Sequence, residues 1–150
     1  MKKLVSFAAM LLVLAGMIAC GKENEIEIYE NHDISACTVD DPLVNIDWLK
    51  KFCTEHSKSK FTIEIHIYIS RNKVNTILIM TKPFMDNFHA EQGVSVYPYN
   101  QFVLKNCLGD SVMSGETSVD SENFFPETPD WNQFFDDNED AGLIWAINKE

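Results

Sequence analysis

Basic side chains are scarce in this 150-residue sequence. Twelve Lys and Arg residues stand against 23 Asp and Glu residues, and the formal net charge is −11. Proteins that bind nucleic acid need a basic surface to neutralise phosphates, so this charge excludes nucleic acid as a partner. It also argues against electrostatic attraction to anionic lipid head groups, whereas a basic protein partner and simple solubility are both compatible with it.

The motifs of cofactor and metal chemistry are missing as well. The six Gly residues are not clustered into a phosphate-binding loop, the four Cys residues form no CxxC pair, and the four His residues have no HxH or HxxxH spacing. The acidic run Asp136–Asp140 resembles the start of a calcium loop. With Asp136 as its first position, however, Ala141 replaces the required Gly and Ile147 replaces the required Glu. We therefore expect no cofactor and no metal site, and we interpret the acidic run as a solvated loop.

The N-terminus has the pattern of a lipoprotein signal. A positively charged start, Met1–Lys3, precedes an apolar stretch over Leu4–Ala15. This stretch is too short to span a bilayer, which takes about 20 apolar residues, but it fits a secretion signal. A small residue, Ala19, then stands directly before Cys20. Lipoprotein signal peptidase requires a Cys here, because the thiol of this Cys accepts a diacylglyceryl group before the peptidase cleaves the chain. We therefore predict Cys20 as the lipid attachment site.

This signal predicts an exported, lipid-anchored protein with three segments. Residues 1–19 are the signal peptide, 20–41 a tether and N-terminal loop, and 42–150 a single domain. The partner expected first is the membrane, reached through acyl chains on Cys20, where each buried methylene contributes ~0.8 kcal/mol. The expected location is the outer membrane, on its periplasmic face or at the cell surface.

Three Cys residues remain once Cys20 carries lipid. They are Cys37, Cys53 and Cys107, and an exported protein can oxidise them. Because three is odd, at most one intramolecular disulfide can form. The sequence does not choose the pair. We favour Cys53–Cys107, since both residues lie in segments expected to pack on one core, with three buried free thiols as the alternative.

Hydrophobic periodicity outlines the domain. Apolar residues at helical spacing after Asp41-Pro42 predict a helix that ends near Ser57. Strict alternation over Phe61–Ser70 predicts a strand with one buried face, and Val74–Thr81, which is apolar on both faces, predicts its central partner strand. Further strands are expected over 94–97, 101–107, 111–114 and 143–147.

Strands that follow strands, with one early helix, indicate an α+β fold. We predict an antiparallel β-sheet of about five to six strands with one N-terminal helix packed on one face.

Several short motifs resemble those of small lipoproteins from gut and oral Bacteroidetes. They are the helix signature over Pro42–Lys50 with its Trp-Leu-Lys run, the turn Gly109-Asp110 and the C-terminal Leu143–Trp145. The Lys and acidic residues over 21–27 also resemble the export signal that follows the lipidated Cys in this group. The resemblance covers about half of the mature chain. It implies a Trp-Leu-Lys helix on an antiparallel sheet and a surface or periplasmic location, and it implies no particular activity.

Five aromatic residues in an acidic surround form the first candidate site. As a binding surface they would supply aromatic anchors for an unidentified envelope protein or peptide. Alternatively, they pin a long loop to the core. Asp130 is a candidate cap for a short helical turn among them. The five residues are Phe124, Phe125, Trp131, Phe134 and Phe135.

His66 is the second candidate. It lies on the polar face of the alternating strand, between Glu64 and Tyr68. It would act as a general base or ligand oriented by Glu64, or it is simply an exposed cross-strand polar residue.

The function expected from these observations is a non-enzymatic binding or interaction module anchored at the cell envelope. Two alternatives remain. One is a small hydrolase that uses His66 with a carboxylate, and the other is an inhibitor or immunity-type protein whose acidic surface blocks a basic partner.

Overall fold

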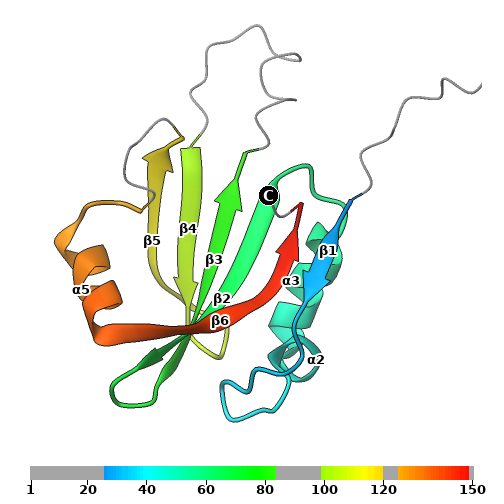
Figure 1. The fold of residues 1–150 in the computed structure, drawn as a ribbon, viewed down its shortest axis with the longest axis horizontal. Helices are drawn as coiled ribbons and strands as arrows, with labels where there is room; N and C mark the ends of the chain where they lie inside the picture. The colour runs from blue at the N-terminus through cyan, green and yellow to red at the C-terminus, as the bar shows by residue number, and fades with distance from the viewer. Residues whose placement is uncertain (1–25, 84–98, 120–124, 149–150) are drawn as a thin grey trace, which may run out of the picture.

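The computed structural model describes residues 26–83, 99–119 and 125–148, which form a six-stranded antiparallel sheet with helices on both of its sides (Figure 1). The strands lie in the order β1-β6-β2-β3-β4-β5, so the two ends of the described chain are neighbours in the sheet. In chain order the elements are β1 (Ile28–Glu30), α2 (Pro42–Asn45), α3 (Asp47–His56), β2 (Thr62–Ser70), β3 (Asn75–Lys82), β4 (Tyr99–Lys105), β5 (Ser111–Ser118), α5 (Pro129–Asp137) and β6 (Asn138–Ile147).

The predicted architecture, a sheet of about five to six strands with one N-terminal helix packed on one face, is wrong. Strand makes up 46% of the described residues and helix only 22%. The expected N-terminal helix is two short helices, because Ile46 between them has an extended backbone (φ −106°, ψ 105°). A third helix, α5, belongs to the opposite face. Apolar spacing alone reveals neither a one-residue break nor a nine-residue helix inside an acidic segment.

The alternating strand and its partner are confirmed. In β2, Ile63, Ile65 and Ile67 are buried on one face, as the period of two predicts. In β3 both faces are buried, and the strand lies between β2 and β4 in the sheet. The doubly apolar run therefore marks a central strand, as expected from its composition.

One hydrophobic cluster collects the odd-numbered isoleucines of β2 and β3. Leu43 of α2 and Leu49 of α3 belong to the same cluster, as does Trp145 of β6. Leu49 is fully buried, and burying a leucine side chain stabilises a fold by ~1.5–3 kcal/mol. In Figure 1, α3 lies behind β6 and β1.

The second cluster lies on the other face and includes α5. Trp131 and Phe134 of α5 pack with Tyr68, Leu78 and Phe102 of the sheet. The cap of α5 is Thr128, whose hydroxyl oxygen accepts from the backbone N–H of Trp131, so the prediction of Asp130 as the cap is wrong. Asp130 instead lies in the first turn, one residue after Pro129.

Part of the segment predicted as a tether and N-terminal loop belongs to the sheet. Ile28–Glu30 pairs with β6, which overlaps a short strand that the sequence also allows over Glu25–Tyr29, and Ala36 is buried in the first cluster. Residues 1–25, which include the predicted signal and Cys20, lie outside the described residues, as does the strand predicted over 94–97.

The acidic run also differs from the prediction. Asp136–Asp140 is not a solvated loop, because it ends α5 and begins β6. The pairing of β6 with β2 has register shifts on both sides of the Ile67↔Gly142 pair. Gly142 has a φ of +131°, which disfavours any other residue at this irregularity. β6 therefore bends across the sheet and carries its acidic end to the face that holds α5 (Figure 1).

Candidate functional site

The described cysteines pair differently from the prediction. Cys107 is bonded to Cys37, with Cα atoms 5.5 Å apart, so the predicted Cys53–Cys107 disulfide is wrong. The Cys37–Cys107 bond forms because the tight turn at Cys37 lies next to the turn after β4, although the two cysteines are 70 residues apart in the sequence. Cys53 is a free thiol. Burial raises its pKa to about 12, with a further contribution from the charge of Glu30, so Cys53 is not an activated nucleophile at neutral pH.

The aromatic residues near the C-terminus are core residues rather than an exposed surface. Trp131 is 2% exposed and Phe134 is 9% exposed. The Phe134 ring lies 5.1 Å from the Tyr68 ring, centroid to centroid. Phe125 and Phe135 are partly buried against the same cluster. These four residues therefore pin their segment to the sheet, and the predicted binding surface is wrong for them, while Phe124 lies outside the described residues.

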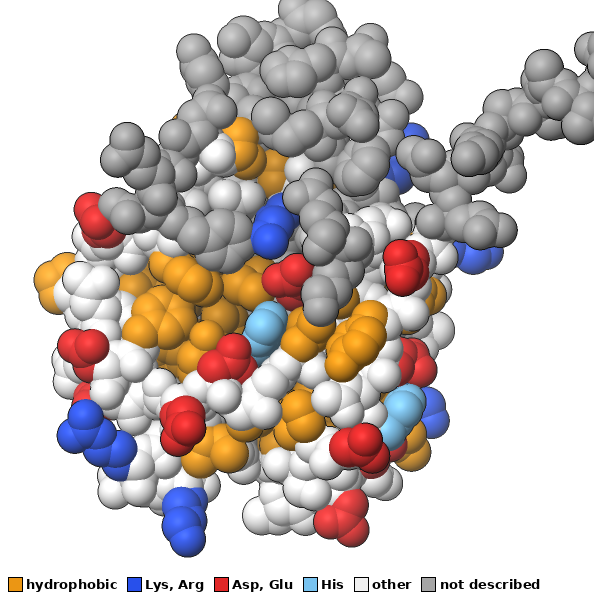
Figure 2. Space-filling model, in the orientation of Figure 1, with side chains coloured by type: hydrophobic (Ala, Val, Ile, Leu, Met, Phe, Trp, Pro, Cys, Tyr) orange, Lys and Arg blue, Asp and Glu red, His pale blue; other side chains and the backbone are white. Residues whose placement is uncertain are grey.

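His66 lies in a charged cluster on the same face as α5. Its Nδ1 is 3.0 Å from Oδ2 of Asp140, and its Nε2 is 3.8 Å from Oε2 of Glu64. Lys82 Nζ lies 3.8 Å from the other oxygen of Glu64. Burial lowers the pKa of His66, but hydrogen bonding to Glu64 and Asp140 and their negative charges outweigh burial, so the pKa is raised. Figure 2 shows acidic side chains scattered over this face, with a histidine beside acidic groups near its centre.

This geometry resembles an ion-pair cluster more than a catalytic one. Sequence reasoning named Glu64 as the partner that orients His66, but the closer partner is Asp140, which comes from β6. A hydrolytic base needs one ring nitrogen directed at a nucleophile or a water. Both nitrogens of His66 face carboxylates, and among the described residues no hydroxyl or thiol is hydrogen-bonded to either of them.

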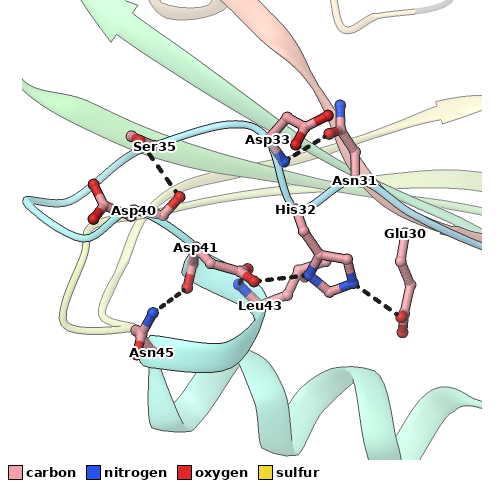
Figure 3. Close-up of polar contacts among 9 residues, drawn as sticks. All are labelled: Glu30, Asn31, His32, Asp33, Ser35, Asp40, Asp41, Leu43 and Asn45. Atoms are coloured by element: carbon pink, nitrogen blue, oxygen red, sulfur yellow. Dashed lines mark hydrogen bonds and ion pairs between the residues drawn. The ribbon is translucent and has the colours of Figure 1, made fainter.

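A second histidine links β1 to α2 (Figure 3). His32 Nδ1 lies 2.8 Å from Oδ2 of Asp41, and Nε2 lies 3.4 Å from Oε2 of Glu30. The other oxygen of Asp41 accepts from the backbone N–H of Leu43, so Asp41 caps α2. The hydrogen bond to Asp41, together with the charges of both carboxylates, raises the pKa of His32. The cluster is exposed, and we interpret it as a polar clasp between β1 and the helix cap.

A groove of about 660 Å³ lies between α3 and β4 and is called the α3–β4 groove below. Its apolar lining comes from Phe52 of α3, Ile63 of β2, Ile79 of β3 and Val103 of β4. Phe61, which is 44% exposed, lies at its edge. Ligand pockets typically enclose ~300–1,000 Å³, so its size suits a small molecule.

The polar lining of the α3–β4 groove is basic. Three lysines, Lys58, Lys60 and Lys105, contribute to it, against one carboxylate, Glu55. Sequence reasoning missed this site, because the Ser-Lys-Ser-Lys run over 57–60 is typical of an ordinary turn after a helix. The spacing of these lysines gave no signal, because Lys50 and Lys51 are closer together in the sequence and do not line the groove.

A smaller groove of about 350 Å³ lies beside the His32 clasp. It is lined by Glu30 and His32 on one side and by Leu43 and Cys53 on the other. The half-buried Cys53 thiol stays protonated at neutral pH, because burial raises its pKa to about 12. Neither groove is lined by His66, Glu64 or Asp140.

Comparisons with models of protein families, with curated proteins and with solved structures found no match to this chain. Within the ranges 26–83, 99–119 and 125–148, no three His, Cys, Asp or Glu residues lie close enough to hold a metal ion. In the same ranges no helix has both the length and the apolar character needed to cross a bilayer.

Proposed function

We propose that this protein is a lipid-anchored binding module of the bacterial cell envelope and that the α3–β4 groove is its binding site. The observation that carries the proposal is the groove itself, with an apolar lining from three strands and one helix and a polar rim. Small-molecule sites combine these two features, since apolar area gives affinity and a few polar groups fix orientation.

The titratable side chains of the domain favour binding over catalysis. His66 is engaged by two carboxylates, and burial keeps the Cys53 thiol protonated. Lysines at the rim of the α3–β4 groove have no ordinary role in stabilising the core. They are consistent with a ligand that brings the opposite charge.

The anchor is supported by the pattern that ends at Cys20. A basic start, a short apolar stretch and a small residue before the cysteine together fit a lipoprotein signal. The resemblance to Bacteroidetes lipoproteins leads to the same proposal of a periplasmic or surface location.

The anchor is tested by expressing the full chain in a bacterium fed with an alkyne-tagged palmitate. We expect the label on the wild-type protein and in the membrane fraction, and we expect its loss in Cys20→Ala. The matched control is Cys53→Ala, which removes the other unpaired cysteine and should keep the label. An unlabelled wild-type protein, or a labelled Cys20→Ala protein, would contradict the anchor.

The binding site is tested on residues 20–150 with Cys20→Ser, a chain that retains every described helix and strand. Its amide resonances are followed by NMR while aromatic fragments are added. We expect shifts centred on Ile79 and Val103. Shifts confined to the α5 face, or none at millimolar fragment, would contradict the α3–β4 groove as a binding site.

A further inference from the structure

We propose that the ligand of the α3–β4 groove is a small organic anion, with a carboxylate or similar acidic group on an apolar body. This inference rests on the proposed function, because it assigns a chemical class to the ligand of the same site.

The first argument is local charge. The whole chain has a formal net charge of −11, yet three of the four charged side chains that line the groove are lysines. The exception, Glu55, lies 3.8 Å from Lys51 of the same helix, so a cation outside the groove already faces it. The groove is therefore a positive site on a negative protein, and it attracts anions while the surrounding surface repels them.

The second argument is that two of these cations are available. Within the described residues, no carboxylate lies within 4.0 Å of the ammonium group of Lys58 or Lys60. Both side chains are exposed, and they flank the turn that leads from α3 into β2. A ligand carboxylate at this end of the groove would meet two ammonium groups.

The third argument is the fixed position of Lys105. Its Nζ donates to the carbonyl oxygen of Gly109 at 2.8 Å and to the hydroxyl of Ser111 at 3.3 Å, and it lies 5.7 Å from the centre of the Trp48 ring. These contacts hold the ammonium group near the last residue of β4, whereas Gln101 lies near the start of the strand. An ammonium has three donors, so one remains for a ligand. Lys105 thus extends the positive potential along the groove without loss of side-chain freedom on binding.

The apolar lining sets the other half of the ligand. Phe52, Ile63, Ile79 and Val103 offer a surface that inorganic phosphate or sulfate would leave unused. Along β4, the groove extends from Gln101 to Lys105, ~14 Å at the usual rise per strand residue. That length suits a bicyclic aromatic ring or a short aliphatic chain rather than a long peptide.

The test compares three probes that share one ring system and differ in charge. They are 2-naphthoate, 2-naphthol and 2-naphthylmethylammonium, titrated by calorimetry into residues 20–150 with Cys20→Ser. We expect naphthoate to bind ~10-fold more tightly than the ammonium probe in low salt, with naphthol between them. The difference should shrink at high ionic strength, because salt screens exposed charges.

Variants then locate the charge. Lys58→Gln/Lys60→Gln should weaken naphthoate ~5–10-fold, at about two- to threefold for each exposed charge pair, and leave naphthol unchanged. The matched control is Lys50→Gln/Lys73→Gln, which removes two exposed lysine charges outside the groove and should change naphthoate binding less than twofold. Penta-glutamate, which carries charge without an apolar body, should not compete.

Each outcome has a distinct meaning. If the three probes bind equally, or the ammonium probe binds most tightly, the assignment of an anion is wrong while the proposed binding site stands. If penta-glutamate competes, the ligand is an acidic peptide and the small-molecule assignment is wrong. If none of the probes binds at millimolar concentration, the proposed binding site fails together with this inference.

Discussion

Removal of the Cys37–Cys107 disulfide should destabilise the protein by an amount that the fold lets us estimate. The bond closes a loop of 70 residues of sequence that contains α2, α3, β2, β3 and β4. In the chain-entropy account, such a loop restricts the unfolded chain by ~4 kcal/mol at 25 °C. Domains of this size are stable by only ~5–15 kcal/mol, so the effect is a large fraction of the total.

The turn that carries Cys37 moderates this estimate. Cys37 and Thr38 have φ values of 56° and 65°. Ala36 before them and Val39 after them form two backbone hydrogen bonds with each other. Positive φ at both central residues is the pattern of a type I′ turn, which ordinarily takes Asn-Gly. The strain costs ~1–2 kcal/mol per residue, and part of it can relax once the bond is absent. We therefore expect a loss of ~2–4 kcal/mol.

The assay is guanidinium unfolding followed by tryptophan fluorescence, with and without reductant. Cys37→Ala/Cys107→Ala should lose the stated stability and become insensitive to reductant. Cys53→Ala is the matched control, which should lose less than ~1.5 kcal/mol and remain fully sensitive to reductant. A Cys53→Ala protein that is insensitive to reductant would show that Cys53 takes part in the bond, and the reasoning above would then be wrong.

Three further changes follow from single contacts. Thr38 is exposed and β-branched at a positive φ, so Thr38→Gly should raise the free energy of unfolding by ~1 kcal/mol, and a decrease in the same assay would mean that the turn is not strained. The raised pKa of His66 means that its contribution to stability is complete below pH ~6.5 and is lost as the pH rises through the folded pKa. Asp140→Asn should lower that pKa in an NMR titration, and an unchanged pKa would exclude the pair in solution. A Cβ at Gly115 would lie 2.7 Å from Nε1 of Trp131, so Gly115→Val should cost ~2 kcal/mol in thermal unfolding, and a neutral result would show that the tryptophan can move.

Strand patterning was readable from the sequence because its physical basis is local. The alternation over Phe61–Ser70 and the doubly apolar run in β3 each indicate which faces are buried, and the structure confirms both. The cap at Asp41 is local too, since its carboxylate accepts from a residue two positions away. Patterns of this kind depend on neighbours within a few residues.

Long-range partners were not readable in this way. The bond to Cys107 comes from Cys37, and the carboxylate nearest to His66 comes from β6 at the far end of the chain. Helix α5 was read as a short turn because its acidic residues obscure the two aromatic residues that it buries. The same burial removed those aromatic residues from the set of candidate binding groups.

The α3–β4 groove shows why a site can escape a sequence altogether. Its residues come from α3, the turn after it and three strands, and each one alone is an ordinary core or surface residue. The sequence by itself determined the acidic balance and the faces of the central strands, and it predicts a lipoprotein signal, because composition and periodicity are properties of neighbouring residues. Only the tertiary structure decided the disulfide, the partners of His66 and the basic groove, because each depends on which distant strands the sheet places side by side.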